Sequence, residues 1–152
     1  MQIKEIMTER PIRVSSTDTV LGAIRIMNHH QIRHLPVVRG TQLVGIISER
    51  DIRTIIGTVS EVEQDRLWID REKLCYVVEA VMTTDVHTLS PDDSVSTAIT
   101  LFVARRIGAL PVATDDGTLV GIVSYIDLLN HIVSPMSGVE GDAVPVEEAP
   151  SD

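Results

Sequence analysis

The chain has 152 residues, of which 43% are hydrophobic and 23% charged, so it can form one unit of ordinary size with a substantial buried core. Its formal net charge of −9 argues against a general binder of nucleic acids or anionic membranes, because such surfaces need an excess of basic residues. Aromatic residues make up only 3%, so aliphatic side chains must fill the core, and stacking platforms for single-stranded nucleic acid are not expected.

A cytoplasmic location without a membrane partner is expected on two grounds. The sequence has neither an apolar run long enough to span a membrane nor the hydrophobic segment of a signal peptide. Its one cysteine, Cys75, cannot form an internal disulfide, which fits a reducing compartment.

The first part of the chain predicts the element order strand, helix, strand, strand, helix. Ser15 and Asp18 are expected to start the first helix, with the serine as its cap. Strands are expected at residues 11–14 and 35–38 and from Leu43 onward, with a turn at residues 39–40. The two helices are expected to bury apolar faces formed by Val20, Ala23, Ile24 and Met27 and by Ile52, Ile55 and Ile56.

The stretch LVGIISERD at residues 43–51 joins a buried-strand pattern to Ser48 and, three residues later, Asp51. Its simplest interpretation is a helix start, in which the hydroxyl accepts from a backbone N–H and the carboxylate favours the positive end of the helix dipole. A functional interpretation can coexist with it, because a carboxylate at a strand-to-helix corner can also accept from the two hydroxyls of a ribose.

The second part of the chain repeats the first. Residues 119–127 read LVGIVSYID, with Ser124 and Asp127 in the places of Ser48 and Asp51, and duplication is the simplest explanation. The repeated helix is expected to start at Ser90, with Pro91 at its first helical position. Because a unit of roughly 50 residues cannot cover both faces of a three-stranded sheet, the two copies are predicted to pack around a pseudo-two-fold axis.

Four segments are therefore predicted. Copy 1 covers residues 1–56 and copy 2 covers residues 78–133. Residues 57–77 form a partly helical connector that packs Trp68 against the body, and residues 134–152 form a flexible acidic tail rich in proline.

The doubled pattern resembles a pair of CBS domains, named after cystathionine β-synthase. Each copy has Met-Thr, then a Ser/Asp helix start, then Ile-x-x-Leu-Pro-Val and Leu-Val-Gly-Ile-x-Ser-x-x-Asp, within residues 3–133. The connector and the length resemble stand-alone bacterial CBS-pair proteins, including the acetoin-utilisation type. The resemblance implies an α/β (α+β) fold of tandem CBS motifs and a homodimer joined through helices. It also implies a regulatory module that senses an adenosine ligand such as AMP, ADP, ATP or S-adenosylmethionine and signals to a protein target that the sequence does not name.

The resemblance also implies which residues meet the ligand. The ribose is expected at Ser48 and Asp51 and at Ser124 and Asp127. The base is expected at Ile46 and Ile122, and phosphate at Arg33 and His34, where copy 2 has Gly108 and Ala109.

The two clefts are expected to differ. In the family each cleft draws residues from both copies, so Arg50 is predicted to lie in the Asp127 cleft and Ile126 in the Asp51 cleft. Because a guanidinium grips phosphate in a bidentate way, the Asp127 cleft is predicted to prefer phosphorylated nucleotides.

Two alternatives remain, a structural or dimerising module with empty clefts and a nucleotide hydrolase. The hydrolase is the weaker of the two, because a repeat gives Asp51 and Asp127 equal environments, whereas acid–base work needs two unlike carboxyl groups. No catalytic residue or covalent cofactor is expected. No metal is expected either, since His29, His30 and His34 lack the spacing of a ligand set.

Overall fold

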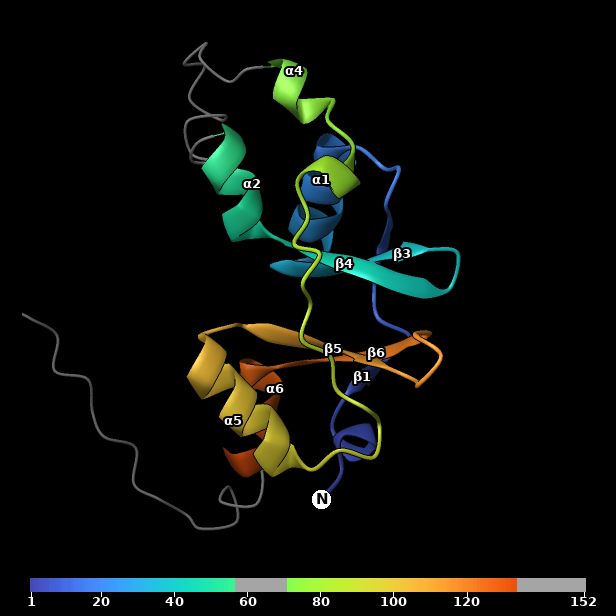
Figure 1. Ribbon diagram of the computed structural model, residues 1–152. Helices are drawn as coiled ribbons and strands as arrows, with labels where there is room; N and C mark the ends of the chain where they lie inside the picture. The colour runs from blue at the N-terminus through green and yellow to red at the C-terminus, as the bar shows by residue number, and fades with distance from the viewer. Residues whose placement is uncertain (57–70, 134–152) are drawn as a thin grey trace, which may run out of the picture.

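The computed structural model describes residues 1–56 and 71–133, in which two three-stranded sheets face each other and helices cover their outer sides (Figure 1). The first half contains β2 (Val14–Ser15), α1 (Val20–His30), β3 (His34–Arg39), β4 (Gln42–Ser48) and α2 (Glu49–Ile56). The second half contains α5 (Val95–Arg105), β5 (Ala109–Ala113), β6 (Leu119–Ser124) and α6 (Tyr125–Val133). The predicted α/β fold of two repeated motifs is confirmed.

Short elements open each half. The chain begins with a 3₁₀ turn, η1 (Ile3–Glu5), and a short strand, β1 (Thr8–Glu9). The second half is preceded by α4 (Arg71–Leu74) and a second 3₁₀ turn, η2 (Val78–Ala80). Trp68, most of the predicted connector and the predicted tail at residues 134–152 lie outside the described residues.

The two sheets have the orders β2-β3-β4 and β1-β6-β5. In each, the central hairpin is antiparallel, β3 with β4 and β5 with β6, as the repeated sequence predicts. The extended segments expected before each first helix are shorter than predicted, because β2 has two residues and its counterpart is the single parallel bridge between Leu89 and Val112. In their place, the second sheet gains β1, which comes from the start of the chain.

The first helix of each copy begins later than predicted. The Ser15 N–H donates to Asp18 Oδ2 at 2.8 Å, and this bond closes a turn instead of a helix. The chain is then extended at Thr19, whose hydroxyl caps α1 by accepting from the Gly22 N–H at 3.1 Å. Copy 2 repeats the difference, so Pro91 lies in a turn and Ser94 is the cap of α5.

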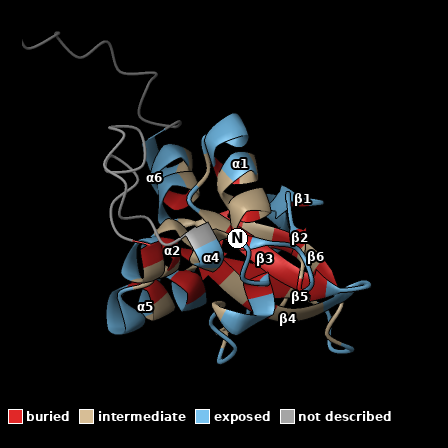
Figure 2. Cartoon of the chain, turned by 90° about the horizontal axis from the view of Figure 1, so that it is seen from above, coloured by how far each residue is buried: buried red, intermediate tan, exposed pale blue. Residues whose placement is uncertain are grey.

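Each copy has its own core, and each core is completed by a residue from the opening segment of the other copy. Ile3 is fully buried among the copy 2 residues Leu89 and Leu110, and Val78 is fully buried among the copy 1 residues. Equivalent hydrogen bonds fix the two segments, from the Ile3 N–H to the Asp93 carbonyl at 2.9 Å and from the Val78 N–H to the Asp18 carbonyl at 2.7 Å. The buried residues gather on the strands and on the helix faces turned toward them (Figure 2).

The glycine of each Leu-Val-Gly stretch allows the opening segment of the other copy to approach. A Cβ on Gly45 would lie 2.5 Å from Met82 Sδ and 2.9 Å from the Thr83 carbonyl oxygen. Ile46 and Thr83 exchange backbone hydrogen bonds of 3.0 and 2.9 Å at this point. Gly121 is pressed in the same way by Met7. The repeated Met-Thr pairs therefore join the copies to each other.

Candidate ligand-binding clefts

A serine and an aspartate form a closed corner where β6 passes into α6. The Ser124 N–H and hydroxyl both donate to Asp127 Oδ2 at 2.7 Å, and the Asp127 N–H donates back to Ser124 Oγ at 3.2 Å. This reciprocal arrangement is a capping box, so the predicted helix start is confirmed here. The corner fixes the carboxylate, because the serine holds one of its two oxygens.

Copy 1 has the same corner at the end of β4. The Ser48 N–H and hydroxyl donate to Asp51 Oδ2 at 2.8 Å, and the Asp51 N–H donates to Ser48 Oγ at 3.2 Å. Within residues 1–56 and 71–133, no hydrogen bond reaches the Oδ1 atom of either aspartate. A carboxylate has about four acceptor positions, so each corner keeps an oxygen available to a ligand hydroxyl.

The Asp127 corner lies in the wall of a cleft of about 560 Å³. This volume falls within the range of about 300–1,000 Å³ that is typical of small-molecule sites. Copy 1 contributes an arginine and a histidine to it, and both copies contribute apolar side chains. Arg33 and His34 line it beside Ile12, Ile32, Ile122 and Ile126.

The Asp51 corner lies in a smaller cleft of about 220 Å³. Its wall carries more charge, with guanidinium groups from Arg50 and Arg106 and side chains from Asp85 and His87. Ile46 lines it as Ile122 lines the other cleft. His34, Gly108 and Ala109 line both clefts.

The clefts bring together the predicted site residues with one error of placement. Arg50 lies in the Asp51 cleft and Ile126 in the Asp127 cleft, so the prediction that each crosses to the other copy's cleft is wrong. Arg50 and Asp51 both belong to the first turn of α2, which begins directly after Ser48, and therefore they border the same cleft.

Each cleft does draw residues from both copies, through the opening segments. Thr8 and Ile12 reach the Asp127 cleft, and Thr83 and His87 reach the Asp51 cleft. Sequence reasoning did not assign these residues to the clefts. The repeated Met-Thr pairs marked the segments, but the exchange between copies is visible only in the structure, in the pairing of β1 with β6 and of Ile46 with Thr83.

The surroundings of His34 shift the pKa of its side chain. Burial lowers the pKa of His34 below its ordinary value, and this desolvation is the largest effect. The carboxylate of Asp51 acts against it, the charge of Arg33 adds to the lowering, and the carboxylate of Glu49 raises the pKa. The imidazole is therefore biased toward its neutral form.

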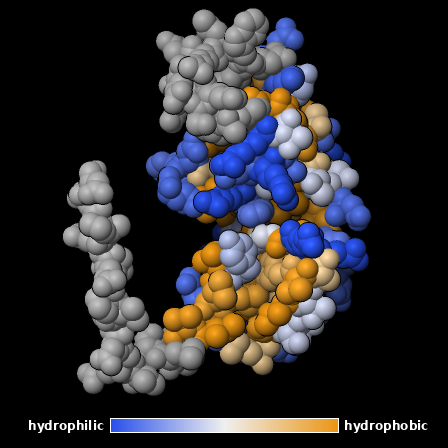
Figure 3. Space-filling view, turned by 90° about the vertical axis from the view of Figure 1, so that its left-hand side faces the viewer, coloured by the Kyte–Doolittle hydropathy of each residue, from blue (hydrophilic) through white to orange (hydrophobic). Residues whose placement is uncertain are grey.

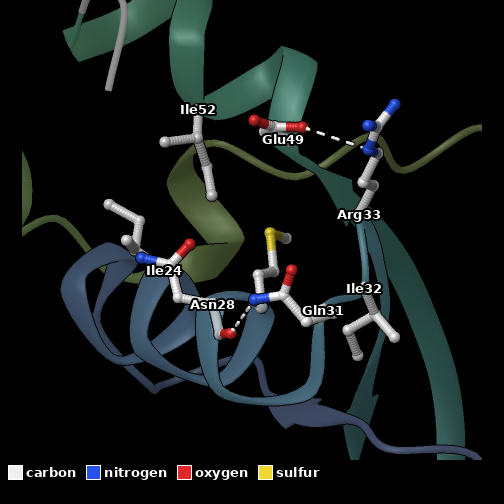
Figure 4. A pocket seen from close by; sticks show the side chains of 8 residues that line it. Ile24, Asn28, Gln31, Ile32, Arg33, Glu49 and Ile52 are labelled. Atoms are coloured by element: carbon white, nitrogen blue, oxygen red, sulfur yellow. Dashed lines mark hydrogen bonds and ion pairs between the residues drawn. The ribbon is translucent and has the colours of Figure 1, made fainter. Parts of the chain in front are cut away.

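Arg33 has a second neighbour outside the clefts. Its Nε lies 3.7 Å from Glu49 Oε2, and its side chain is 80% exposed. Figure 4 shows this pair at a separate pocket of about 250 Å³ between α1 and α2, where the Gln31 amide donates to the Asn28 carbonyl at 2.7 Å. The pocket has no Ser/Asp corner, so the two clefts remain the better candidates for a ligand with a diol.

The histidines on α1 form a pair. The rings of His29 and His30 are 4.8 Å apart and nearly perpendicular. Across residues 1–56 and 71–133, no three metal-ligating side chains gather at one place. The same ranges contain no helix with the length and apolar character needed to cross a membrane.

Several solved structures have the same fold. The CBS domain pair of protein MJ0100, in complex with 5′-methylthioadenosine and S-adenosyl-L-methionine, is 28% identical with a TM-score of 0.71, over 89% of this chain and 98% of that one. A protein described as an acetoin utilization protein, AcuB from Vibrio cholerae, is 26% identical with a TM-score of 0.72, over 90% of this chain and 93% of that one. The acetoin type is thus one of several structural neighbours.

Relatives in sequence include proteins of very different length. Inosine-5′-monophosphate dehydrogenase of Methanocaldococcus jannaschii is 32% identical over 88% of this chain, but the chain spans only 24% of that enzyme. An uncharacterized protein of the same organism, MJ1426, is 32% identical over 88% of this chain and 92% of its own length. Such relatives occur outside bacteria. Residues 3–58 and 78–134 each match the CBS domain, and the chain therefore belongs to the CBS domain family with two motifs in tandem.

Proposed function

We propose that the protein is a regulatory module without catalytic activity that binds an adenosine compound in the Asp127 cleft and signals its presence to a protein target. The observation that carries this proposal is the fixed carboxylate of Asp127, whose Oδ2 is held by Ser124 at the wall of a cleft of suitable volume. Its remaining oxygen can accept from a ribose hydroxyl.

The walls of the Asp127 cleft support an adenosine ligand. Ile12, Ile122 and Ile126 offer apolar surface to a base, as small-molecule sites commonly do. The CBS pair of MJ0100, whose complex contains 5′-methylthioadenosine and S-adenosylmethionine, gives independent support, since both compounds contain adenosine. That this chain is a stand-alone CBS pair of the acetoin-utilisation type stays a prediction.

Phosphate is better served by the other cleft. The guanidinium groups of Arg50 and Arg106 both line the Asp51 cleft, whereas Arg33 of the Asp127 cleft also faces Glu49. Bidentate guanidinium contacts favour phosphate. We therefore expect the Asp51 cleft to bind AMP or ATP more tightly than it binds a neutral adenosine compound.

A thermal-shift experiment tests the proposal with AMP, ATP, S-adenosylmethionine and 5′-methylthioadenosine. A ligand at a hundred times its Kd stabilises the folded state by about 2.7 kcal/mol. Asp127→Ala is expected to weaken the binding of at least one compound by about tenfold or more, because it removes a charged hydrogen-bond acceptor.

Asp93→Ala is the matched control. Asp93 Oδ2 accepts from the Ser90 N–H at 2.7 Å, as Asp127 Oδ2 accepts from Ser124, but Asp93 borders neither cleft. Both variants should lower the unfolding temperature, and only Asp127→Ala should weaken the ligand-induced shift. Equal ligand-induced shifts in both variants would show that Asp127 does not hold the ligand, and no shift with any compound would favour a structural module. Turnover of a nucleotide that disappears in Asp127→Ala would favour a hydrolase.

The exposed surface of helices α5 and α6 in copy 2 supports a homodimer. Exposed apolar side chains occupy this face, whereas the corresponding face of copy 1 is mainly hydrophilic (Figure 3). Val103 is 74% exposed where copy 1 has Asn28, and Leu129 is 52% exposed where copy 1 has Arg53. Copy 1 folds with polar residues at these positions, so the fold does not require apolar ones. Other exposed apolar residues of α5 and α6 include Ile99, Ile132 and Val133.

The partner best suited to this face is a second copy of the chain. An isologous contact places the same uncharged surface on both sides, so no like charges meet within the contact although each chain carries a net charge of −9. The charged face of copy 1, with Glu49 bound to Arg53 at 2.6 Å, would lose solvation against an apolar partner.

A further inference from the structure

The two clefts share one ionisable side chain. Among the described residues, His34, Gly108 and Ala109 line both clefts, and only His34 of these three can carry charge. It begins β3, where it pairs in register with Ser48 of the Asp51 corner. Any change in its charge is therefore felt on both sides.

The ring of His34 packs against Gly108 of copy 2. A Cβ on Gly108 would lie 2.8 Å from His34 Cε1 and 3.0 Å from Nε2, so only glycine leaves room for the imidazole there. The position equivalent to His34 in copy 2 is Ala109, which has no ring. A single imidazole thus forms the polar part of the partition between the clefts.

We propose that His34 couples the two clefts, such that an anionic group bound in one favours the imidazolium form and thereby strengthens the binding of an anionic group in the other. This inference rests on the proposed function, since it requires that both clefts bind a ligand. It adds a regulatory role to a residue that the family resemblance marks only as a phosphate contact.

The physical basis is the cost of charging the ring. Burial lowers the pKa of His34, so the ring is mainly neutral near neutral pH. A phosphate in the first cleft must favour protonation against that burial, and the second phosphate then meets an imidazolium that is already formed and donates from both nitrogens. A partly buried site makes this interaction stronger than in water.

Other ionisable groups affect the pKa of His34 or line the two clefts with it. Those of copy 1 are Arg33, Glu49, Arg50 and Asp51, and those of copy 2 are Asp85, His87, Arg106 and Asp127. The other histidine of this set, His87, lines the Asp51 cleft alone. His87 does not line the Asp127 cleft and therefore serves as the control.

Calorimetry with AMP, and with adenosine as an uncharged probe, tests the coupling in the full chain at pH 7.5. We expect two AMP binding events, the second strengthened about fivefold or more. Proton uptake, measured in two buffers of different ionisation enthalpy, should accompany the first. His34→Gln should remove both the coupling and this uptake. Because His34 lines both clefts, each binding event is expected to weaken, but the two events should persist independently of each other. His34→Ala serves as a second variant, because alanine already occupies the equivalent position in copy 2. His87→Gln should retain the coupling.

Several results would overturn the inference while leaving the proposed function intact. These are AMP binding in one cleft only, two independent events in the unaltered protein, coupling that survives in His34→Gln, or equal coupling with adenosine. A complete absence of binding by AMP and by all other adenosine compounds would instead overturn the proposed function and this inference together.

Discussion

At Asp127, one carboxylate oxygen closes the start of α6 and the other remains open toward the cleft. The serine that holds the carboxylate also removes much of its rotational freedom before any ligand arrives. A ligand that binds this oxygen does not have to order the side chain, which reduces the entropic cost of binding.

His34 makes the stability of the fold depend on pH. Burial lowers its pKa, so the unfolded chain binds a proton more readily than the folded protein does. The free energy of unfolding should therefore be highest above the ordinary histidine pKa of about 6.5 and should fall as pH drops through the lowered pKa. His34→Gln should flatten this part of the curve, as measured by urea unfolding between pH 7.5 and 5.

His29→Gln, on the exposed end of α1, provides the comparison for this measurement. It should retain the fall in stability at acid pH that His34→Gln loses. If His34→Gln and the unaltered protein give parallel curves, the burial of His34 does not contribute to acid sensitivity.

At the scale of elements, the glycine of each Leu-Val-Gly strand has a packing role. Gly45→Ala would place a Cβ 2.9 Å from the Thr83 carbonyl oxygen, which belongs to the backbone and cannot turn aside. We expect a loss of about 1–3 kcal/mol in the free energy of unfolding, the usual cost of overpacking. Denaturant unfolding measures it.

The control for Gly45→Ala is Gly22→Ala in α1. A Cβ on Gly22 would meet only Thr19 Oγ1, at an ordinary 3.4 Å. Because alanine is the better helix former, this variant should gain up to about 1 kcal/mol. A neutral Gly45→Ala would show that the Met-Thr segment can move away without cost.

Local chemistry explains which elements the sequence predicts well. The Ser48 and Ser124 corners follow from residues three positions apart, and both form as expected. Ser15 and Asp18 carry the same local signature but close a turn, because the next residues are drawn into an extended pairing, with the Val20 N–H bound to the Tyr76 carbonyl at 2.8 Å. No pattern within a few residues distinguishes these two outcomes.

At the scale of the molecule, duplication predicts two clefts but not their composition. The misplacement of Arg50 arose because the family resemblance indicates that both copies contribute, without indicating which segments cross. Those segments are the opening ones, and their path depends on contacts between residues that lie far apart in the sequence, such as Thr8 and Ile122.

The proposed dimer is tested by Leu129→Glu. A carboxylate on the apolar face of α6 would be buried without a partner, so we expect dissociation to become at least about tenfold easier. Sedimentation velocity at micromolar concentration should then report the 16.7 kDa monomer. Arg53→Glu, at the equivalent position of copy 1, should leave the dimer unchanged. A monomer before any substitution, or equal weakening by both variants, would contradict this assignment.

The exchange of opening segments has a consequence for synthesis on the ribosome. Copy 1 emerges first, yet its core lacks Val78 until the chain has grown past that residue, and Ile3 must wait for the last strands and helix of copy 2. Although domains usually fold in order as they emerge, neither copy can complete its core independently here. The opening residues of copy 1 are thus expected to be among the last to reach their final place, which favours folding of the two copies together through contacts of high contact order.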